Sequence, residues 1–279
     1  MLKRSRMERE RKTPQRVCSA AHPRRARRAG WVLAISLGLF GAPAAVHATP
    51  AEDAALLRAA TYGDAAAVQA LLDKHVDVNV HDPSGATPLM RAALRGNAPV
   101  VALLLRRGAA VNAQDRDGYS ALMRAAWRGY TDIVTQLLKR GADVNQRNQQ
   151  NFTAIHLAAW GGFTTTVKAL LVAKPALDVQ DRGAHQGYSA LMRAAAAGNT
   201  EIVRLLLAAG ARVDLKNSEG ATALELARSG GHAEVVRLLC ARMKGPPPAA
   251  CSEPTTKRTP SSTRPPPINF NAERQLPPR

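Results

Sequence analysis

A unit of about 33 residues recurs along this chain and constrains its fold more than any other feature. A glycine occupies the turn position of the unit at residues 85, 118, 187 and 220, and Asn151 occupies it in the remaining copy. The intervals are 33, 33, 36 and 33 residues. A period of this size indicates one supersecondary unit that is copied and stacked. Units this small depend on their neighbours to bury their apolar faces.

The segment 115–147 shows how one unit folds. Gly118 marks a turn, and Ser120 then caps a short helix over 121–128. A second helix over 131–140 carries an apolar stripe at the 3.6-residue period. The stripe consists of Ile133, Val134, Leu137 and Leu138. The unit is therefore a pair of antiparallel helices that follows a turn.

The segment 82–114 carries the same pattern in its fullest form. Its characteristic residues are Gly85, Thr87-Pro88-Leu89, Ala92-Ala93, Gly96, Val100-Val101, Leu103-Leu104-Leu105, Gly108 and Val111-Asn112. On these residues the chain resembles ankyrin-repeat proteins. The resemblance implies an all-α ankyrin-repeat solenoid of about six helix-turn-helix repeats with β-turn fingers.

The resemblance divides residues 49–244 into an ankyrin-repeat domain. It begins with a degenerate repeat that lacks the turn signature, as a terminal repeat does when it has no upstream neighbour. The repeats span 51–81, 82–114, 115–147, 148–180, 181–216 and 217–243. The segment 245–279 is rich in Pro, Ser and Thr, and this composition predicts a disordered tail.

The first 48 residues have the pattern of a secretory signal peptide. A basic run at 24–28 precedes an apolar run at 31–40, and Val46-His47-Ala48 is a small-x-small cleavage site. The mature chain is therefore predicted to begin at Thr49, although an uncleaved anchor remains an alternative. The net charge of the chain is +18, and half of it lies in 1–48, where 11 Lys/Arg face 2 Asp/Glu. Removal of this segment weakens the argument for a nucleic-acid partner.

Export also changes the interpretation of the cysteines. The signal would take Cys18 away and leave Cys240 and Cys251 in an oxidising compartment. A disulfide between these two residues is one interpretation. A buried free thiol at Cys240 is the other, because this residue occupies a leucine position of the last helix.

The sequence contains no motif for catalysis, a cofactor or a metal. It lacks a Gly-rich phosphate loop, G-x-S-x-G, H-E-x-x-H and a cysteine pair at metal-ligand spacing. His156 and His232 occupy positions at which the resemblance implies structural hydrogen bonds. Arg91, Arg124 and Arg193 repeat after Leu-Met, and we interpret them as long stems that cover neighbouring repeats with their charged heads in water. We therefore expect a non-enzymatic protein.

The candidate binding site is a row of aromatic and arginine residues in the central repeats. The resemblance implies that the turns and the exposed ends of the first helices line a concave face. Tyr, Trp and Arg are the residue types that anchor protein interfaces. The predicted protein-binding residues are Arg95, Arg116, Tyr119, Trp127, Arg128, Gln150, Phe152, Trp160 and Tyr188. The alternative is that Trp127 and Trp160 pack on each other between adjacent repeats.

Together these patterns predict an exported bacterial scaffold, periplasmic or secreted, that binds a protein partner. A secreted effector that binds host proteins is the alternative, and binding of an anionic polymer or membrane by the basic tail is a third hypothesis. We expect a monomer without a nucleic-acid partner and without stable membrane insertion after signal cleavage.

Overall fold

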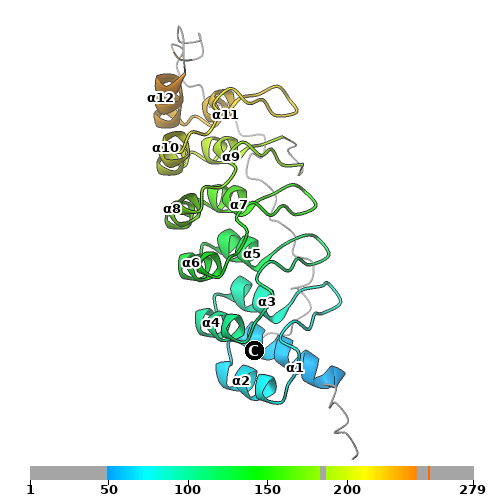
Figure 1. The fold of residues 1–279 in the computed structure, drawn as a ribbon. Helices are drawn as coiled ribbons and strands as arrows, with labels where there is room; N and C mark the ends of the chain where they lie inside the picture. The colour runs from blue at the N-terminus through cyan, green and yellow to red at the C-terminus, as the bar shows by residue number, and fades with distance from the viewer. Residues whose placement is uncertain (1–48, 183–186, 244–250, 252–279) are drawn as a thin grey trace, which may run out of the picture. The chain divides into compact units, whose positions relative to one another are not determined.

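The computed structural model describes residues 49–182, 187–243 and 251. These residues contain twelve α-helices and no β-strand, which confirms the predicted all-α repeat fold (Figure 1). The helices are α1 (Pro50–Tyr62), α2 (Ala65–Asp73), α3 (Pro88–Arg95), α4 (Ala98–Arg106), α5 (Ala121–Arg128), α6 (Thr131–Lys139), α7 (Ala154–Gly161), α8 (Thr164–Val172), α9 (Ala190–Ala196), α10 (Thr200–Ala208), α11 (Ala223–Ser229) and α12 (Ala233–Arg242). The predicted signal peptide (1–48) and, apart from Cys251, the predicted tail (245–279) lie outside the described residues.

The helices stack in two rows. The odd-numbered helices contact one another in order from α1 to α11, and the even-numbered helices do the same from α2 to α12. Figure 1 shows the turns between repeats projecting beside the odd-numbered row. We call the side formed by these turns and the ends of the odd-numbered helices the first-helix face. Leu, Val, Ile and Ala side chains between the two rows form one continuous core.

Hydroxyl residues start every odd-numbered helix. In α5 the Ser120 hydroxyl accepts the backbone N–H of Met123 at 3.5 Å, as the cap prediction required. In α1 the Thr49 hydroxyl accepts the N–H of Glu52, whose carboxylate accepts the backbone N–H of Thr49 in return. The caps occupy Thr49, Thr87, Ser120, Thr153, Ser189 and Thr222. These helices are too short to be stable alone, so capping and stacking determine where they begin.

Glycine ends several first helices where the next repeat comes close. Gly129 has a φ of +75°, and a Cβ atom there would lie 2.4 Å from the ring of Phe163 in the following repeat. Gly96 meets the ring of Tyr130 in the same way, with a closest distance of 2.8 Å. Gly141, which ends a second helix, has a φ of +83° but nothing within 4 Å of the corresponding Cβ position. The first-helix glycines therefore serve the stacking of repeats as well as the turn itself.

Backbone hydrogen bonds join neighbouring turns. The N–H of Arg116 donates to the Ser84 carbonyl at 2.9 Å, and the N–H of Arg182 donates to the Gln150 carbonyl at 2.7 Å. The N–H of Gln149 donates to the Asp117 carbonyl at 3.0 Å. Because each turn is held by the one beside it, side chains on successive turns project from a fixed frame.

Two further features concern the cysteines and the length of the helices. Cys240 in α12 and Cys251 are joined by a disulfide, with Cα atoms 6.0 Å apart, so the structure has the first of the two cysteine arrangements. Between Thr49 and Met243, leaving out 183–186, no helix is both long and apolar enough to span a bilayer.

Candidate functional site

The structure divides the nine predicted binding residues into three groups. Tyr119, Phe152 and Tyr188 are buried, with 6%, 2% and 9% of their surface exposed. The expectation that these three rings are available to a partner was wrong. Each ring directly follows a turn residue, where the backbone carries it inward between repeats and away from solvent.

Phe152 meets the two tryptophans in one cluster. Trp127 and Trp160 are half-buried, and their rings are 5.3 Å apart in an edge-to-face arrangement. The ring of Phe152 lies 5.9 Å from that of Trp160. The alternative in which the tryptophans pack on each other between repeats is therefore what the structure has, and both remain partly exposed.

Arg193 stands at the centre of this cluster. Its guanidinium carbon lies 4.5 Å from the centroid of Trp160, 4.8 Å from that of Tyr188 and 5.3 Å from that of Phe152. Its Nε and Nη2 both donate to Asp181 Oδ2, at 2.9 and 2.5 Å. Since the Asp181 side chain is 0% exposed, the cluster is a buried ion pair enclosed by aromatic rings.

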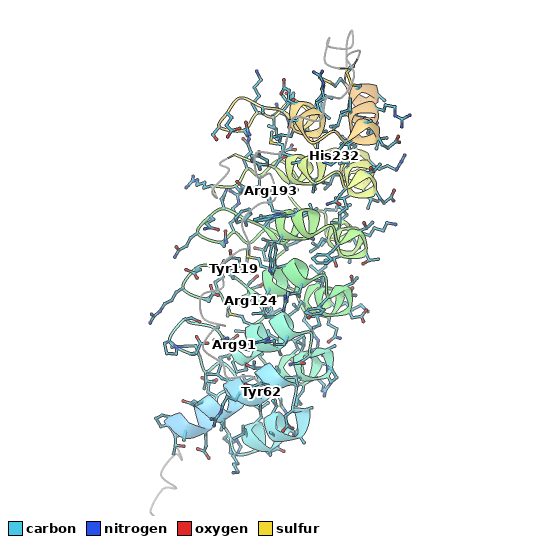
Figure 2. The ribbon with its side chains drawn as sticks, turned by 180° about the vertical axis from the view of Figure 1, so that it is seen from behind. Tyr62, Arg91, Tyr119, Arg124, Arg193 and His232 are labelled. Carbon is cyan, nitrogen blue, oxygen red and sulfur yellow. A yellow bond between two sulfur atoms is a disulfide. The ribbon has the colours of Figure 1, made fainter. Side chains whose placement is uncertain are left out.

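The same pairing recurs along the stack. Arg91 pairs with Asp82, and Arg124 pairs with Asp115. Figure 2 shows Arg91, Arg124 and Arg193 one above another along the stack. The interpretation that these arginine heads reach water was wrong, because the side chains of Arg124 and Arg193 are only 9% and 4% exposed. The guanidinium groups pair instead with the aspartates of the turns.

Two repeats use a neutral version of the pair. Where the turn residue is Asn148 or Asn217, the helix position that carries arginine elsewhere is Leu157 or Leu226. The Oδ1 atom of Asn148 accepts the backbone N–H of Phe152 at 2.8 Å, just as that of Asp115 accepts the N–H of Tyr119 at 2.8 Å. The turn therefore needs only one side-chain oxygen to accept its backbone N–H. Aspartate, which has a second carboxylate oxygen, occurs at this position only where an arginine pairs with that oxygen.

Burial perturbs three titratable groups in this region. Burial raises the pKa of the Tyr119 phenol to about 12, raises the pKa of the Tyr188 phenol, and lowers the pKa of His156 to about 4. His156 Nε2 lies 2.8 Å from the Val179 carbonyl, so this nitrogen carries the proton and donates. Nδ1 then accepts from the Thr153 hydroxyl at 2.8 Å. His156 is therefore a neutral structural residue, and His232 similarly meets the Ala196 carbonyl at 3.1 Å.

The lowered pKa of His156 predicts a pH-dependent stability. The unfolded chain binds the histidine proton near pH 6.5 and the folded chain only near pH 4, so stability present above pH 6.5 is lost as the pH falls toward 4. The expected loss in unfolding free energy is on the order of 3 kcal/mol. Urea denaturation from pH 7.5 to 4 measures it. His156→Gln, which has no imidazole, should show a shallower dependence, and equal slopes in the two proteins would contradict the assignment.

The other four predicted residues are exposed. Arg95 and Arg128 end α3 and α5, and Arg116 and Gln150 lie in turns. Tyr62 occupies the position equivalent to Arg95 and Arg128 in the first repeat and is 48% exposed. We call Tyr62, Arg95 and Arg128 the helix-end row. Sequence reasoning missed Tyr62, although its spacing of 33 residues from Arg95 was available in the repeat alignment.

The helix-end row continues into small residues. Gly161, Ala197 and Gly230 take its position in the last three repeats, so the large side chains are confined to the first three. The half-buried Trp127 and Trp160 directly precede Arg128 and Gly161 in the sequence. This part of the first-helix face combines arginines, a tyrosine and two half-buried tryptophans, which is the composition of protein interaction hot spots.

Two segments of the chain match the model of a known protein family. A family model described as ankyrin repeats (three copies) matches residues 56–148 and 149–247. A comparison with curated proteins found no match. No group of three His, Cys, Asp or Glu side chains with the arrangement of a metal site occurs in the part of the chain that the structure describes.

Proposed function

Because the chain belongs to the ankyrin-repeat family, we propose that it is a scaffold of the cell envelope that binds a protein partner through the first-helix face of its central repeats. Ankyrin repeats generally act as protein-protein interaction scaffolds, and proteins built from them are typically non-enzymatic. The observation that carries the proposal is the helix-end row. Arg95 and Arg128 are exposed at the ends of equivalent helices in adjacent repeats, and the half-buried Trp127 directly precedes Arg128.

Arg95 and Arg128 can be replaced without disturbing the fold, whereas the buried aromatic residues cannot. Tyr119, Phe152 and Tyr188 hold neighbouring repeats together, so their replacement would disturb the fold and binding at the same time. Arg95 and Arg128 form no ion pair with another described residue. Their charge can therefore be reversed with little cost to stability.

A pull-down with a matched control tests this function. The full chain carrying Arg95→Glu and Arg128→Glu is expected to lose a partner that the unchanged protein retains from an envelope extract. The control carries Lys139→Glu and Arg140→Glu, which are exposed at the end of α6 on the opposite row and make the same change in charge. The control should retain the partner. Identical partner lists for the unchanged protein and the Arg95/Arg128 variant would refute the site.

Export to the envelope is supported by two local features. The first described helix is capped by Thr49, the residue that would follow cleavage after Ala48. The Cys240–Cys251 disulfide suits an oxidising compartment.

Intact mass spectrometry of the protein recovered from the periplasm tests export. The expected mass corresponds to a chain that begins at Thr49 and contains no free thiol, because removal of 1–48 also removes Cys18. Alkylation should add nothing before reduction and two groups after it. A cytoplasmic protein that keeps residues 1–48 would exclude export, and recovery in the culture medium would favour a secreted effector.

A further inference from the structure

An open hollow lies where the loop after α8 meets the turn that precedes α7. Its volume is about 640 Å³, and its lining includes Arg147, Asn151, Leu177, Asp178 and Arg182. The loop at its edge departs from the other repeats. Lys174 has a φ of +51°, where three other second helices end in a glycine, and Pro175 follows it.

The acidic groups that line the hollow are used within the protein. Asp181 is buried and pairs with Arg193. Asp178 Oδ1 accepts the backbone N–H of Arg212 at 3.0 Å. Asn151 Nδ2 likewise donates to the Gln180 carbonyl at 2.6 Å. The carboxylates at the hollow therefore already have hydrogen-bond donors from the protein.

The two guanidinium groups differ from these acids. Arg147 and Arg182 are exposed, and neither pairs with an acidic residue among 49–182 and 187–243. Their backbones are nevertheless fixed. The Arg147 carbonyl accepts Gln114 Nε2 at 3.0 Å, and the Arg182 N–H donates to Gln150 at 2.7 Å. Arg147 and Arg182 thus extend from fixed backbone positions at the edge of the same hollow.

The exposed ion pairs of the described residues do not include Arg147 or Arg182. They join residues of the even-numbered helices or of the loops that follow them. These pairs are Arg107–Asp73, Lys168–Glu201, Arg204–Glu201, Arg212–Asp214 and Arg237–Glu234. The turn side, by contrast, keeps Arg147 and Arg182 available to an external anion.

We propose that Arg147 and Arg182 bind the carboxylate side chains of an acidic, extended segment of a partner protein. This inference rests on the proposed function and specifies the chemistry of the partner. A guanidinium group presents a planar fork of N–H donors that matches a carboxylate, and two such groups on one rim favour a segment with spaced acidic residues. The half-buried Leu177 lines the hollow between polar groups and gives the segment an apolar contact.

An acidic protein segment suits this hollow better than a nucleic acid. Single-stranded nucleic acids are held by aromatic platforms together with a continuous basic groove. Among the described residues that line the hollow there is no aromatic ring, and Asp178 interrupts their positive charge. Spaced carboxylates can avoid Asp178, whereas a continuous run of phosphates cannot.

Fluorescence anisotropy with the full chain and a short labelled peptide of alternating Glu and Ser tests the inference. The peptide should bind the unchanged protein, and the same peptide with Gln in place of Glu should not. Arg147→Gln with Arg182→Gln should weaken binding at least about tenfold. Arg106→Gln with Arg140→Gln removes the same charge from exposed residues on the even-numbered side and should change it by less than about twofold.

Three results would overturn the inference. The first is the absence of binding to the acidic peptide, and the second is equal weakening in the two double variants, which would show a response to net charge alone. The third is tighter binding of an oligothymidylate than of the peptide. The test is separate from that of the proposed function, because Arg95→Glu/Arg128→Glu leaves the hollow intact. Failure of the peptide with success of the pull-down would remove only this inference.

Discussion

Replacing Arg193 by leucine is expected to reduce the free energy of unfolding by about 3–5 kcal/mol. The substitution leaves the Asp181 carboxylate buried, 0% exposed, without its guanidinium partner. It also removes the cation that lies over Trp160, Tyr188 and Phe152. Asp181→Asn alone is expected to be destabilising for the complementary reason, since it leaves Arg193 buried without its carboxylate.

The double variant Asp181→Asn/Arg193→Leu is expected to recover most of this loss. The chain itself uses that combination at Asn148 with Leu157 and at Asn217 with Leu226. Asparagine keeps the oxygen that the turn requires, and leucine packs without a charge. A well-packed neutral replacement of a buried ion pair is often close to neutral in stability.

A double-mutant cycle by urea denaturation measures the coupling. Arg212→Gln supplies the control, because the Arg212–Asp214 pair is 56% and 64% exposed and its loss should leave the free energy of unfolding almost unchanged. If the double variant is destabilised by the sum of the two single variants, the pairing rule between turn and helix is wrong.

The second large effect is expected at Gly129. Its left-handed φ of +75° costs an alanine about 1–2 kcal/mol, and the added Cβ would meet the Phe163 ring at 2.4 Å. The ring atom Cγ lies at 2.7 Å from the same point and is attached to Phe163 Cβ, so rotation of the ring gives little relief. Overpacking adds about 1–3 kcal/mol. The expected cost of Gly129→Ala is therefore about 2–5 kcal/mol in the free energy of unfolding.

Gly141→Ala separates the backbone contribution from the contact between repeats. Gly141 has a similar φ of +83°, and nothing lies within 4 Å of its Cβ position. Only the backbone cost of about 1–2 kcal/mol is expected there. Urea denaturation followed by circular dichroism compares the two variants. Equal destabilisation would mean that the close approach of neighbouring repeats at Gly129 has no energetic weight.

Much of the fold could be predicted because each local signal has a local physical cause. The capping hydroxyl of Ser120 and the helix-ending Gly129 gave α5 the predicted span of 121–128. The second helix, predicted over 131–140, ends one residue earlier at Lys139. Turn residues and the apolar period act within a few neighbours, so they are visible in the sequence.

The orientation of the aromatic rings could not be predicted in the same way. Residue type alone made Tyr119 and Phe152 good interface anchors, but their exposure depends on the neighbouring repeat, which closes over them. The available signal was the covariation of turn and helix. Asp115 and Arg124 are nine residues apart, and Asn148 and Leu157 keep that spacing with both residues changed. A turn residue that changes together with a helix residue indicates a buried pair, and the adjacent ring must then face the same interior.

The exposed arginines were predicted more successfully than the rings. Arg95 and Arg128 end their helices, where the last turn points away from the core, so a long charged side chain there reaches solvent. Two of the three residues of the helix-end row were therefore predicted from the sequence, and the structure adds the exposed Tyr62.

Site-specific photocrosslinking in living cells tests the central claim most directly. A photoreactive amino acid is placed at Arg95 or Arg128 on the first-helix face, or at Lys139 or Arg140 on the opposite row. The account predicts one discrete protein adduct from the first two positions and none from the last two. Adducts of the same size from all four positions, or from Lys139 and Arg140 alone, would contradict it.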